Sequence, residues 1–257
     1  MSVGAIGSSY ANSYSPYSTI AAGGQLQSAA QDAAGLAIEK KTETQTKGLD
    51  QGTENLGAAK SALNIEDGAM EGITDYLQSI KELAVQAKNG LLSDEDRGYI
   101  QNQIDQYIQG INDLAGSTSF NEKKLLDGST GNMQIATDSN GSSMSVNTYE
   151  TTAQKLGIEG FDVTSGDFDT KVIDDALSKV QENRATVGAQ TNAVDHAMSY
   201  NSKASLELNG FSMDREEDRS IKAVQDLKAK QVIDQYQVML QKKQQEDEAQ
   251  KANMFFA

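Results

Sequence analysis

Apolar residues recur at intervals of three, four and seven along most of this chain, which is the spacing of helices that pack along a narrow seam. Between Leu26 and Lys88 the seam positions are Leu56, Leu63, Ile73, Leu77, Ile80, Ala84 and Ala87. One long helix is therefore predicted here. It ends at Asn89-Gly90, because glycine readily adopts the left-handed conformation that closes a helix.

A second helix is predicted from Ser93 to near Gly116. It begins at Ser93-Asp94-Glu95-Asp96, which resembles a capping box with aspartate in place of the usual glutamate. Its packed face is formed by Ile100, Ile104, Tyr107, Ile111 and Leu114. Helical spacing returns at about Thr170 and again after Asn209-Gly210, so two further helices are predicted. Their seams are Ile173, Leu177, Val180, Val187, Val194 and Met198, and then Ile221, Val224, Leu227, Val232 and Val238.

The middle of the chain follows a period of two. Met133, Ile135 and Thr137 alternate with polar residues, and Met144 and Val146 do the same after Asn140-Gly141. Asn-Gly between two alternating runs indicates a β-hairpin. Residues 157–168 are rich in glycine and aspartate and are predicted to form a loop.

These patterns predict a mainly α protein, a long antiparallel helical bundle or coiled-coil rod with a small β-hairpin insert. The first part is a flexible, low-complexity N-terminal tail. The predicted parts are this tail over 1–24, N-terminal rod helices over 25–130, the hairpin and loop insert over 131–168, a C-terminal rod helix over 169–212 and a last helix over 213–257.

The composition agrees with narrow helical seams. Of the 257 residues, 37% are hydrophobic and 6% aromatic, and none is tryptophan, so a broad aromatic core is not available. Pro16 is the single proline, which leaves the rest of the chain without helix-breaking rings. Cysteine is absent, which excludes disulfides, thiolate nucleophiles and cysteine zinc sites.

The formal net charge of −15 argues against nucleic acids and anionic membranes as partners, because both would repel the chain. No stretch reaches the ~18–20 apolar residues that a membrane span requires. The first basic residue is Lys40, whereas an ordinary secretory signal opens with Lys or Arg. The expectation is a cytoplasmic protein, or one exported by a route that recognises another signal.

No residue pattern indicates an enzyme, a cofactor or a metal site. His196 is the single histidine and is interpreted as a partly packed polar residue. The alternative, a general base beside one of the many serines, has no nucleophile motif to support it. Asp94-Glu95-Asp96 is interpreted as helix-start charge in preference to a cation site. Asp138-Ser139-Asn140-Gly141 is interpreted as a turn in preference to a calcium loop.

Three stretches resemble the flagellin family. They are Ser28–Ile38 (SAAQDAAGLAI), residues 62–128 with ELAVQA at Glu82–Ala87 and FNEKKLLDG at Phe120–Gly128, and residues 173–231 with RATVG at Arg184–Gly188. They occur in family order and cover roughly residues 26–240. The family's motif residues are matched by Asp32, Gly35, Phe120, Asn121, Arg184 and Gly188.

The resemblance implies an extracellular structural subunit of the bacterial flagellum, which self-assembles as a homo-oligomeric filament after export through the flagellar type III apparatus. The N- and C-terminal segments of the chain would pair, and residues 213–257 would lie in the inner tube of the filament. Implied partners are a flagellar export chaperone and hook-associated proteins. The insert is short, so the family's variable outer domains are absent. The N-terminal residues and the polar run Lys242–Lys251 depart from the family pattern on surfaces used for polymerisation and chaperone binding.

Gln78, Lys81, Glu82 and Leu83 fall in the segment by which an innate Toll-like receptor recognises many flagellins. Ser79 stands where an arginine is usual in strongly recognised members, so weak receptor binding is expected. The alternative interpretation is that these four residues are filament-packing surface.

Two alternative functions compete with a filament subunit. One is a hook–filament junction protein, which shares the terminal rod fold, and the other is a secreted flagellin paralogue that does not polymerise. The stretches ELAVQA and FNEKKLLDG favour flagellin over the junction class.

Overall fold

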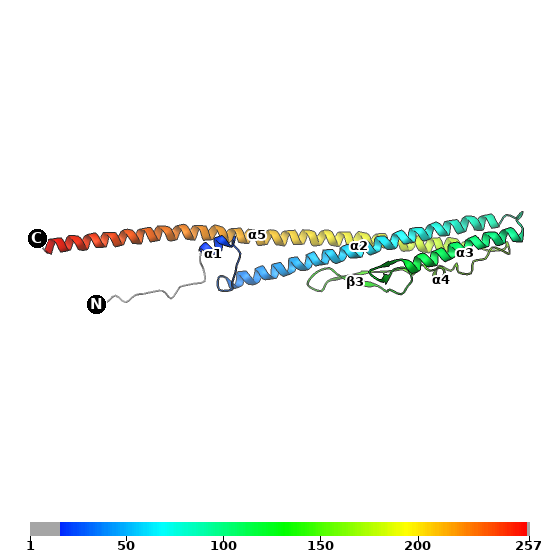
Figure 1. The fold of residues 1–257 in the computed structure, drawn as a ribbon, viewed down its shortest axis with the longest axis horizontal. Coiled ribbons are helices and arrows are strands. Elements are labelled where there is room, and N and C mark those ends of the chain that lie inside the picture. The colour runs from blue at the N-terminus through cyan, green and yellow to red at the C-terminus, as the bar shows by residue number, and fades with distance from the viewer. Residues whose placement is uncertain (1–15, 256–257) are drawn as a thin grey trace. The chain divides into compact units, whose positions relative to one another are not determined.

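The computed structural model describes residues 16–255, with side chains described as far as residue 248 (Figure 1). Packing divides the chain into two units. Unit 1 comprises residues up to Thr46 and from Leu206 onward, and unit 2 runs from Lys47 to Ser205. Two long helices, α2 (Ala33–Ala87) and α5 (Lys171–Phe255), contribute segments to both units.

The segments of α2 and α5 within unit 2 are antiparallel. Lys60 of α2 pairs with Asp195 of α5 at 2.7 Å. Farther along α2, Asp67 pairs with Arg184, and Lys81 then pairs with Asp174. The partner therefore moves backwards along α5 as the position on α2 advances. Helix α3 (Asp94–Ser117) lies alongside in the same unit (Figure 1), and Tyr107 of α3 contacts the ring of Tyr76 on α2. The prediction of an antiparallel helical bundle is confirmed.

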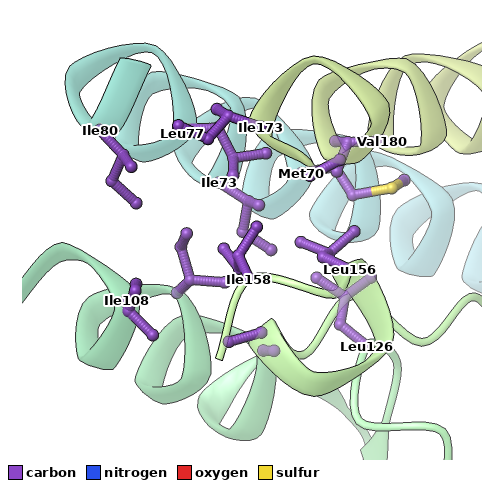
Figure 2. Close-up of a cluster of buried hydrophobic side chains, with 14 of the residues drawn as sticks. Met70, Ile73, Leu77, Ile80, Ile108, Leu126, Leu156, Ile158, Ile173 and Val180 are labelled. Atoms are coloured by element: carbon purple, nitrogen blue, oxygen red, sulfur yellow. The ribbon is translucent and has the colours of Figure 1, made fainter. Parts of the chain in front are cut away.

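The core of unit 2 follows the predicted seams. All seven predicted seam residues of α2 are fully buried, as are Ile104 and Ile111 of α3 and Ile173, Val180 and Val194 of α5. Leu126, Leu156 and Ile158, from the segments after α3, point toward these helices and close the core (Figure 2). Each fully buried Leu, Ile or Val contributes about 1.5–3 kcal/mol relative to an exposed one.

Helix α3 begins as predicted. The Ser93 hydroxyl accepts the Asp96 backbone N–H at 3.2 Å, and the Asp96 carboxylate accepts the Ser93 backbone N–H at 3.0 Å. This reciprocal pair satisfies two donors that a helix N-terminus otherwise leaves without partners. The helix ends at Ser117, one residue beyond the predicted end.

The predicted hairpin is formed by β3 (Met133–Ala136) and β4 (Ser143–Val146), paired with Met133 opposite Val146. The loop 137–142 joins the strands. Residues 157–168 are a loop, as predicted. Two small features were not predicted: the pair β1 (Ser119–Phe120) and β2 (Lys123–Lys124), and helix α4 (Ala153–Leu156).

In unit 1 a short helix, α1 (Pro16–Ala21), stands where a flexible tail was predicted. Pro16 suits the first helical position, where a missing N–H leaves no bond unmade. The Arg219 side chain of α5 donates to the Gly24 carbonyl at 2.6 Å and pairs with Glu39 at 2.9 Å, so the segment after α1 is held on α5. The prediction for residues 1–15 lies outside the described residues.

The predicted break at Asn209-Gly210 is wrong, because α5 continues through it as one helix. Gly210 is not among the glycines with positive φ. An isolated glycine inside a helix costs only about 1 kcal/mol relative to alanine, and no proline follows to prevent continuation. The other proposed boundaries between parts of the chain stay predictions. No described helix combines the length and the apolar character that crossing a membrane requires.

Candidate functional site

The most distinctive surface in unit 1 is an exposed apolar row on α5. Ile221, Val232, Tyr236 and Met239, called here the α5 stripe, are 49%, 65%, 62% and 66% exposed. Their spacing of eleven, four and three places them on one helical face. The α5 stripe includes two positions of the seam predicted for this helix, and no described part of the chain covers it. Apolar rows of this kind mark surfaces that another protein covers.

The four residues of the predicted receptor segment do not present one continuous surface. Gln78 and Glu82, four apart on α2, are exposed. Lys81 is half-buried and forms an ion pair with Asp174 of α5. Leu83 is partly buried and packs against the core. Two of the four side chains are therefore available to a partner, and two hold unit 2 together.

The motif residues Asp32 and Gly35 form the start of α2. The Asp32 carboxylate accepts the Gly35 N–H at 2.8 Å, which makes Asp32 the cap of the helix. A Cβ on Gly35 would lie 2.1 Å from the Asp32 carboxylate, so a side chain there would displace the capping group.

Phe120 and Asn121 lie at the β1–β2 turn. Phe120 packs on the core, and Asn121 and Glu122 both have positive φ, 47° and 66°. Two successive left-handed residues are what a tight hairpin turn requires, and asparagine tolerates this conformation better than most residues. These two motif residues shape a turn.

Arg184 of α5 holds α2 through Asp67 and Glu71. It donates to both Asp67 carboxylate oxygens, at 2.9 and 3.3 Å, and to Glu71 at 3.4 Å. The hydrogen bond to Asp67 raises the pKa of Arg184 above its ordinary value. Gly188 is exposed, and an added Cβ would meet nothing within 4 Å, so nothing in the structure explains glycine there. The motif residues thus occupy separate places and make no shared site.

His196 and Asp138, which the sequence pattern singled out, have different structural environments. His196 is exposed on α5, so its interpretation as partly packed is wrong. Asp138 organises a turn: one carboxylate oxygen accepts the N–H groups of Asn140 and Ser142 at 2.8 and 3.0 Å. The Ser142 hydroxyl donates to the other carboxylate oxygen at 2.7 Å, and this hydrogen bond is the main reason that the Asp138 pKa is lowered. Within residues 16–255 no three His, Asp or Glu side chains lie together as metal ligands would.

Sequence reasoning missed a polar clamp around the hairpin loop. Asn201 of α5, only 4% exposed, donates to the Thr137 carbonyl at 2.8 Å and to the Leu49 carbonyl of α2 at 3.4 Å. The loop lies directly on α2, at the two glycines Gly48 and Gly52. A Cβ added to Gly52 would be 1.8 Å from the Thr137 oxygen, and one added to Gly48 would be 2.3 Å from the Ser139 Cβ, so neither position has room for a side chain. The sequence did offer one signal for this contact: Gly48 and Gly52 are four residues apart and so lie on the same face of a helix.

Sequence reasoning also missed a buried acid. Glu66 of α2 is 1% exposed, and its carboxylate accepts the Tyr149 N–H at 3.1 Å. Burial, assisted by the neighbouring Asp67 charge, raises the pKa of Glu66 to about 8. Within a heptad pattern a glutamate gives no sign that it faces the core.

Comparison with known proteins gives consistent results. The model of the bacterial flagellin N-terminal helical region matches residues 6–131. A flagellar filament 30.7 kDa core protein of Treponema maltophilum is 32% identical over 200 residues, covering 69% of each chain. A flagellin of Halalkalibacterium halodurans is 28% identical over 195 residues, covering 74% of this chain and 72% of the relative.

Solved structures agree. The crystal structure of Bacillus cereus flagellin has a TM-score of 0.51 at 27% identity, covering 58% of this chain and 88% of that one. A putative flagellar hook-associated protein from Vibrio parahaemolyticus has a TM-score of 0.56 at 16% identity, covering 71% and 96%, a likeness that shows the fold alone. Because the sequence matches reported above are to flagellins and a filament core protein, the junction-protein alternative is not favoured. The helical pairing, the motif positions and these sequence matches together show that the chain belongs to the bacterial flagellin family, as a structural subunit of the flagellar filament.

Proposed function

We propose that this chain self-assembles into a homo-oligomeric filament and that the α5 stripe is a surface through which its copies join. The observation that carries the proposal is the exposure of Ile221, Val232, Tyr236 and Met239 on one face of α5. Covering an apolar side chain of this size contributes about 1.5–3 kcal/mol, so each subunit gains several kcal/mol when the stripe is covered.

The test is polymerisation of purified monomer on short filament seeds, followed by light scattering and negative-stain electron microscopy. The double variant Val232→Ser/Tyr236→Ser removes the middle of the α5 stripe. Its matched control, Lys230→Ser/Asp234→Ser, changes two residues with the same spacing on the opposite helical face and leaves the net charge unaltered. Long filaments are expected from the wild type and the control. The stripe variant is expected to remain monomeric with an unchanged helical circular dichroism spectrum.

Two results would count against this assignment. If the stripe variant polymerises like the wild type, copies join through another surface. If the wild-type monomer stays monomeric on seeds while its helices are intact, the chain is better described as a non-polymerising secreted paralogue.

We also propose that the chain is exported unfolded through the flagellar type III channel, with an export chaperone, and joins hook-associated proteins outside the cell. Its membership of the flagellin family supports this route, and a cysteine-free helical chain suits threading through a narrow channel. Expression in a flagellated host should place the protein in the culture medium. Equal secretion from a host without the flagellar export machinery would contradict the route.

Weak recognition by an innate Toll-like receptor is a further proposal. It is supported by the exposure of Gln78 and Glu82, while Lys81 and Leu83 are engaged within unit 2. A reporter-cell assay with purified monomer should give a response below that of a strongly recognised flagellin and lower still for Gln78→Ala/Glu82→Ala. An equally strong response from the wild-type chain would refute weak binding.

A further inference from the structure

Three Asn-Gly pairs occur in this sequence, at Asn89-Gly90, Asn140-Gly141 and Asn209-Gly210. Such a pair is chemically labile because the peptide nitrogen of glycine can attack the side-chain carbonyl carbon of the asparagine, and glycine has no Cβ to obstruct the approach. Sequence alone gives the three pairs equal standing. Their backbone environments in the structure are different.

Asn140-Gly141 lies in the hairpin loop 137–142 of unit 2, and both residues are exposed. Gly141 has φ +89°. Within the described part of the chain the Gly141 N–H makes no hydrogen bond, and the Asn140 side-chain amide donates to the Asp138 carboxylate. The flanks of the pair are held: Asp138 accepts the Asn140 N–H, the Ser142 N–H and, at 2.7 Å, the Ser142 hydroxyl. The attacking nitrogen of Gly141 is therefore unengaged inside an ordered loop. The Asn140 side-chain oxygen accepts no hydrogen bond within the described residues, so its carbonyl carbon remains open to attack.

We infer that Asn140 is a site of spontaneous covalent modification in which water is the only co-reactant. The Gly141 nitrogen loses its proton to a solvent base and bonds to the Asn140 Cγ, and the side-chain amide leaves as ammonia. This gives a five-membered succinimide. Water then opens the ring at either carbonyl, leaving an aspartate or an isoaspartate at this position. The net change is one water consumed and one ammonia released.

The second pair, Asn209-Gly210, also has an exposed asparagine, but both of its residues lie inside helix α5. There the helical backbone holds the glycine nitrogen away from the side-chain carbon and engages its N–H in the helical hydrogen-bond ladder. Reaction requires local opening of the helix, which is a minor state of a folded chain. Exposure alone therefore does not make this pair reactive.

Asn89-Gly90 is intermediate. The Asn89 side-chain oxygen accepts the Leu91 N–H at 3.1 Å, and its backbone carbonyl accepts the Leu92 N–H at 3.1 Å. These bonds must loosen before the side chain can rotate into position, but no helix has to open. The expected order of conversion is Asn140 first, Asn89 next and Asn209 last.

The product alters the loop in two ways. A new carboxylate stands two residues from Asp138, and like charges at this separation repel. An isoaspartate also adds one backbone atom to a loop whose Ser139 is in close contact with Gly48 of α2. The modified loop should exchange its amide hydrogens faster than the unmodified loop, since its contacts with α2 are disturbed.

The experiment follows the purified full chain during incubation at mildly alkaline pH, using peptide mass spectrometry and labelling with an isoaspartate-specific methyltransferase. We expect conversion at Asn140 to exceed conversion at Asn209 by roughly tenfold or more in the folded chain, as local helix opening requires. The two rates should converge in denaturant. The variant Asn140→Gln should remove the earliest product, because glutamine would have to close a less favourable six-membered ring. Its matched control, Asn209→Gln, should leave that product unchanged.

Conversion of Asn209 as fast as Asn140 in the folded chain would overturn the inference. So would an unmodified Asn140 in the folded chain under conditions in which the denatured chain converts both sites.

Discussion

The buried carboxyl of Glu66 should make the stability of this protein depend on pH. Glu66 is 1% exposed in the core of unit 2, and one backbone N–H, from Tyr149, is its only hydrogen bond within the described residues. Burial disfavours the charged form, so the pKa rises from 4.5 to about 8. The variant Glu66→Gln keeps the shape and the acceptor for Tyr149 but carries no titratable group.

The sign follows from proton binding. Between pH 4.5 and 8 the folded state retains the Glu66 proton while the unfolded state has released it. The folded state therefore binds more protons, and the free energy of unfolding falls as pH rises through this window. The slope approaches about 1.4 kcal/mol per pH unit. From about pH 5.5 to 7.5 the wild type should lose ~2–3 kcal/mol through this group.

The assay is urea unfolding followed by far-ultraviolet circular dichroism at several pH values. The quantity compared is the difference in free energy of unfolding between Glu66→Gln and the wild type, since other titrating groups cancel in it. The stability of the variant relative to the wild type should therefore increase by ~2–3 kcal/mol between pH 5.5 and pH 7.5. The control Glu82→Gln changes an exposed carboxylate of the same helix and should follow the wild type. A difference for Glu66→Gln that stays constant with pH would refute the argument.

Two further predictions concern local structure and can be checked by the same unfolding assay at fixed pH. Ser93→Ala removes the capping hydroxyl of α3 and should destabilise by about 1 kcal/mol; an unchanged midpoint would mean that the cap contributes nothing. Gly52→Ala should destabilise by about 1–3 kcal/mol, because its Cβ would meet the Thr137 oxygen at 1.8 Å and the loop must move. Gly68→Ala, on the same helix with nothing within 4 Å, should instead stabilise by about 1 kcal/mol. If Gly52→Ala and Gly68→Ala changed the free energy of unfolding in the same direction, the close packing of the loop on Gly52 would be contradicted.

The elements best predicted from sequence are those whose signal is local. The α2 seam was identified residue by residue, because burial of every third or fourth side chain is written directly into helical periodicity. The start of α3 was identified because Ser93 and Asp96 satisfy each other's backbone within four residues. The β3–β4 hairpin was found from alternation around one Asn-Gly pair.

The elements that were missed either depend on residues far away in sequence or are too short to carry a pattern. The same Asn-Gly signal failed at Asn209-Gly210, since helix continuation there is decided by the whole of α5 and not by two residues. The β1–β2 pair is only two residues per strand, too short for any period to register. Ile221 and Val232 of the α5 stripe belong to a seam predicted to be packed, because periodicity shows that a face is apolar without showing whether this chain or another covers it.

For the candidate site, the resemblance to flagellin indicated motif residues but not what they do. The structure gives several of them individual structural roles, in a helix cap, a turn and an ion pair. The Asn201 clamp and buried Glu66 went unpredicted because polar residues in a helical pattern are usually solvated. Their burial follows from contacts with residues more than sixty positions away.

The seams of unit 2 repeat with a period of seven: Leu56, Leu63, Met70, Leu77 and Ala84 on α2, and Ile173, Val180, Val187 and Val194 on α5. A periodic seam is degenerate, since sliding one helix by a heptad, about 10.5 Å, again places apolar side chains opposite one another. The polar exceptions lift this degeneracy. Lys60 precedes Asp67 by seven residues, so such a slip moves Arg184 from its carboxylate partner to a lysine and removes Asn201 from the carbonyls it serves. The alignment of α2 with α5 is therefore selected, among several nearly equivalent ones, by a few charged side chains and one buried amide.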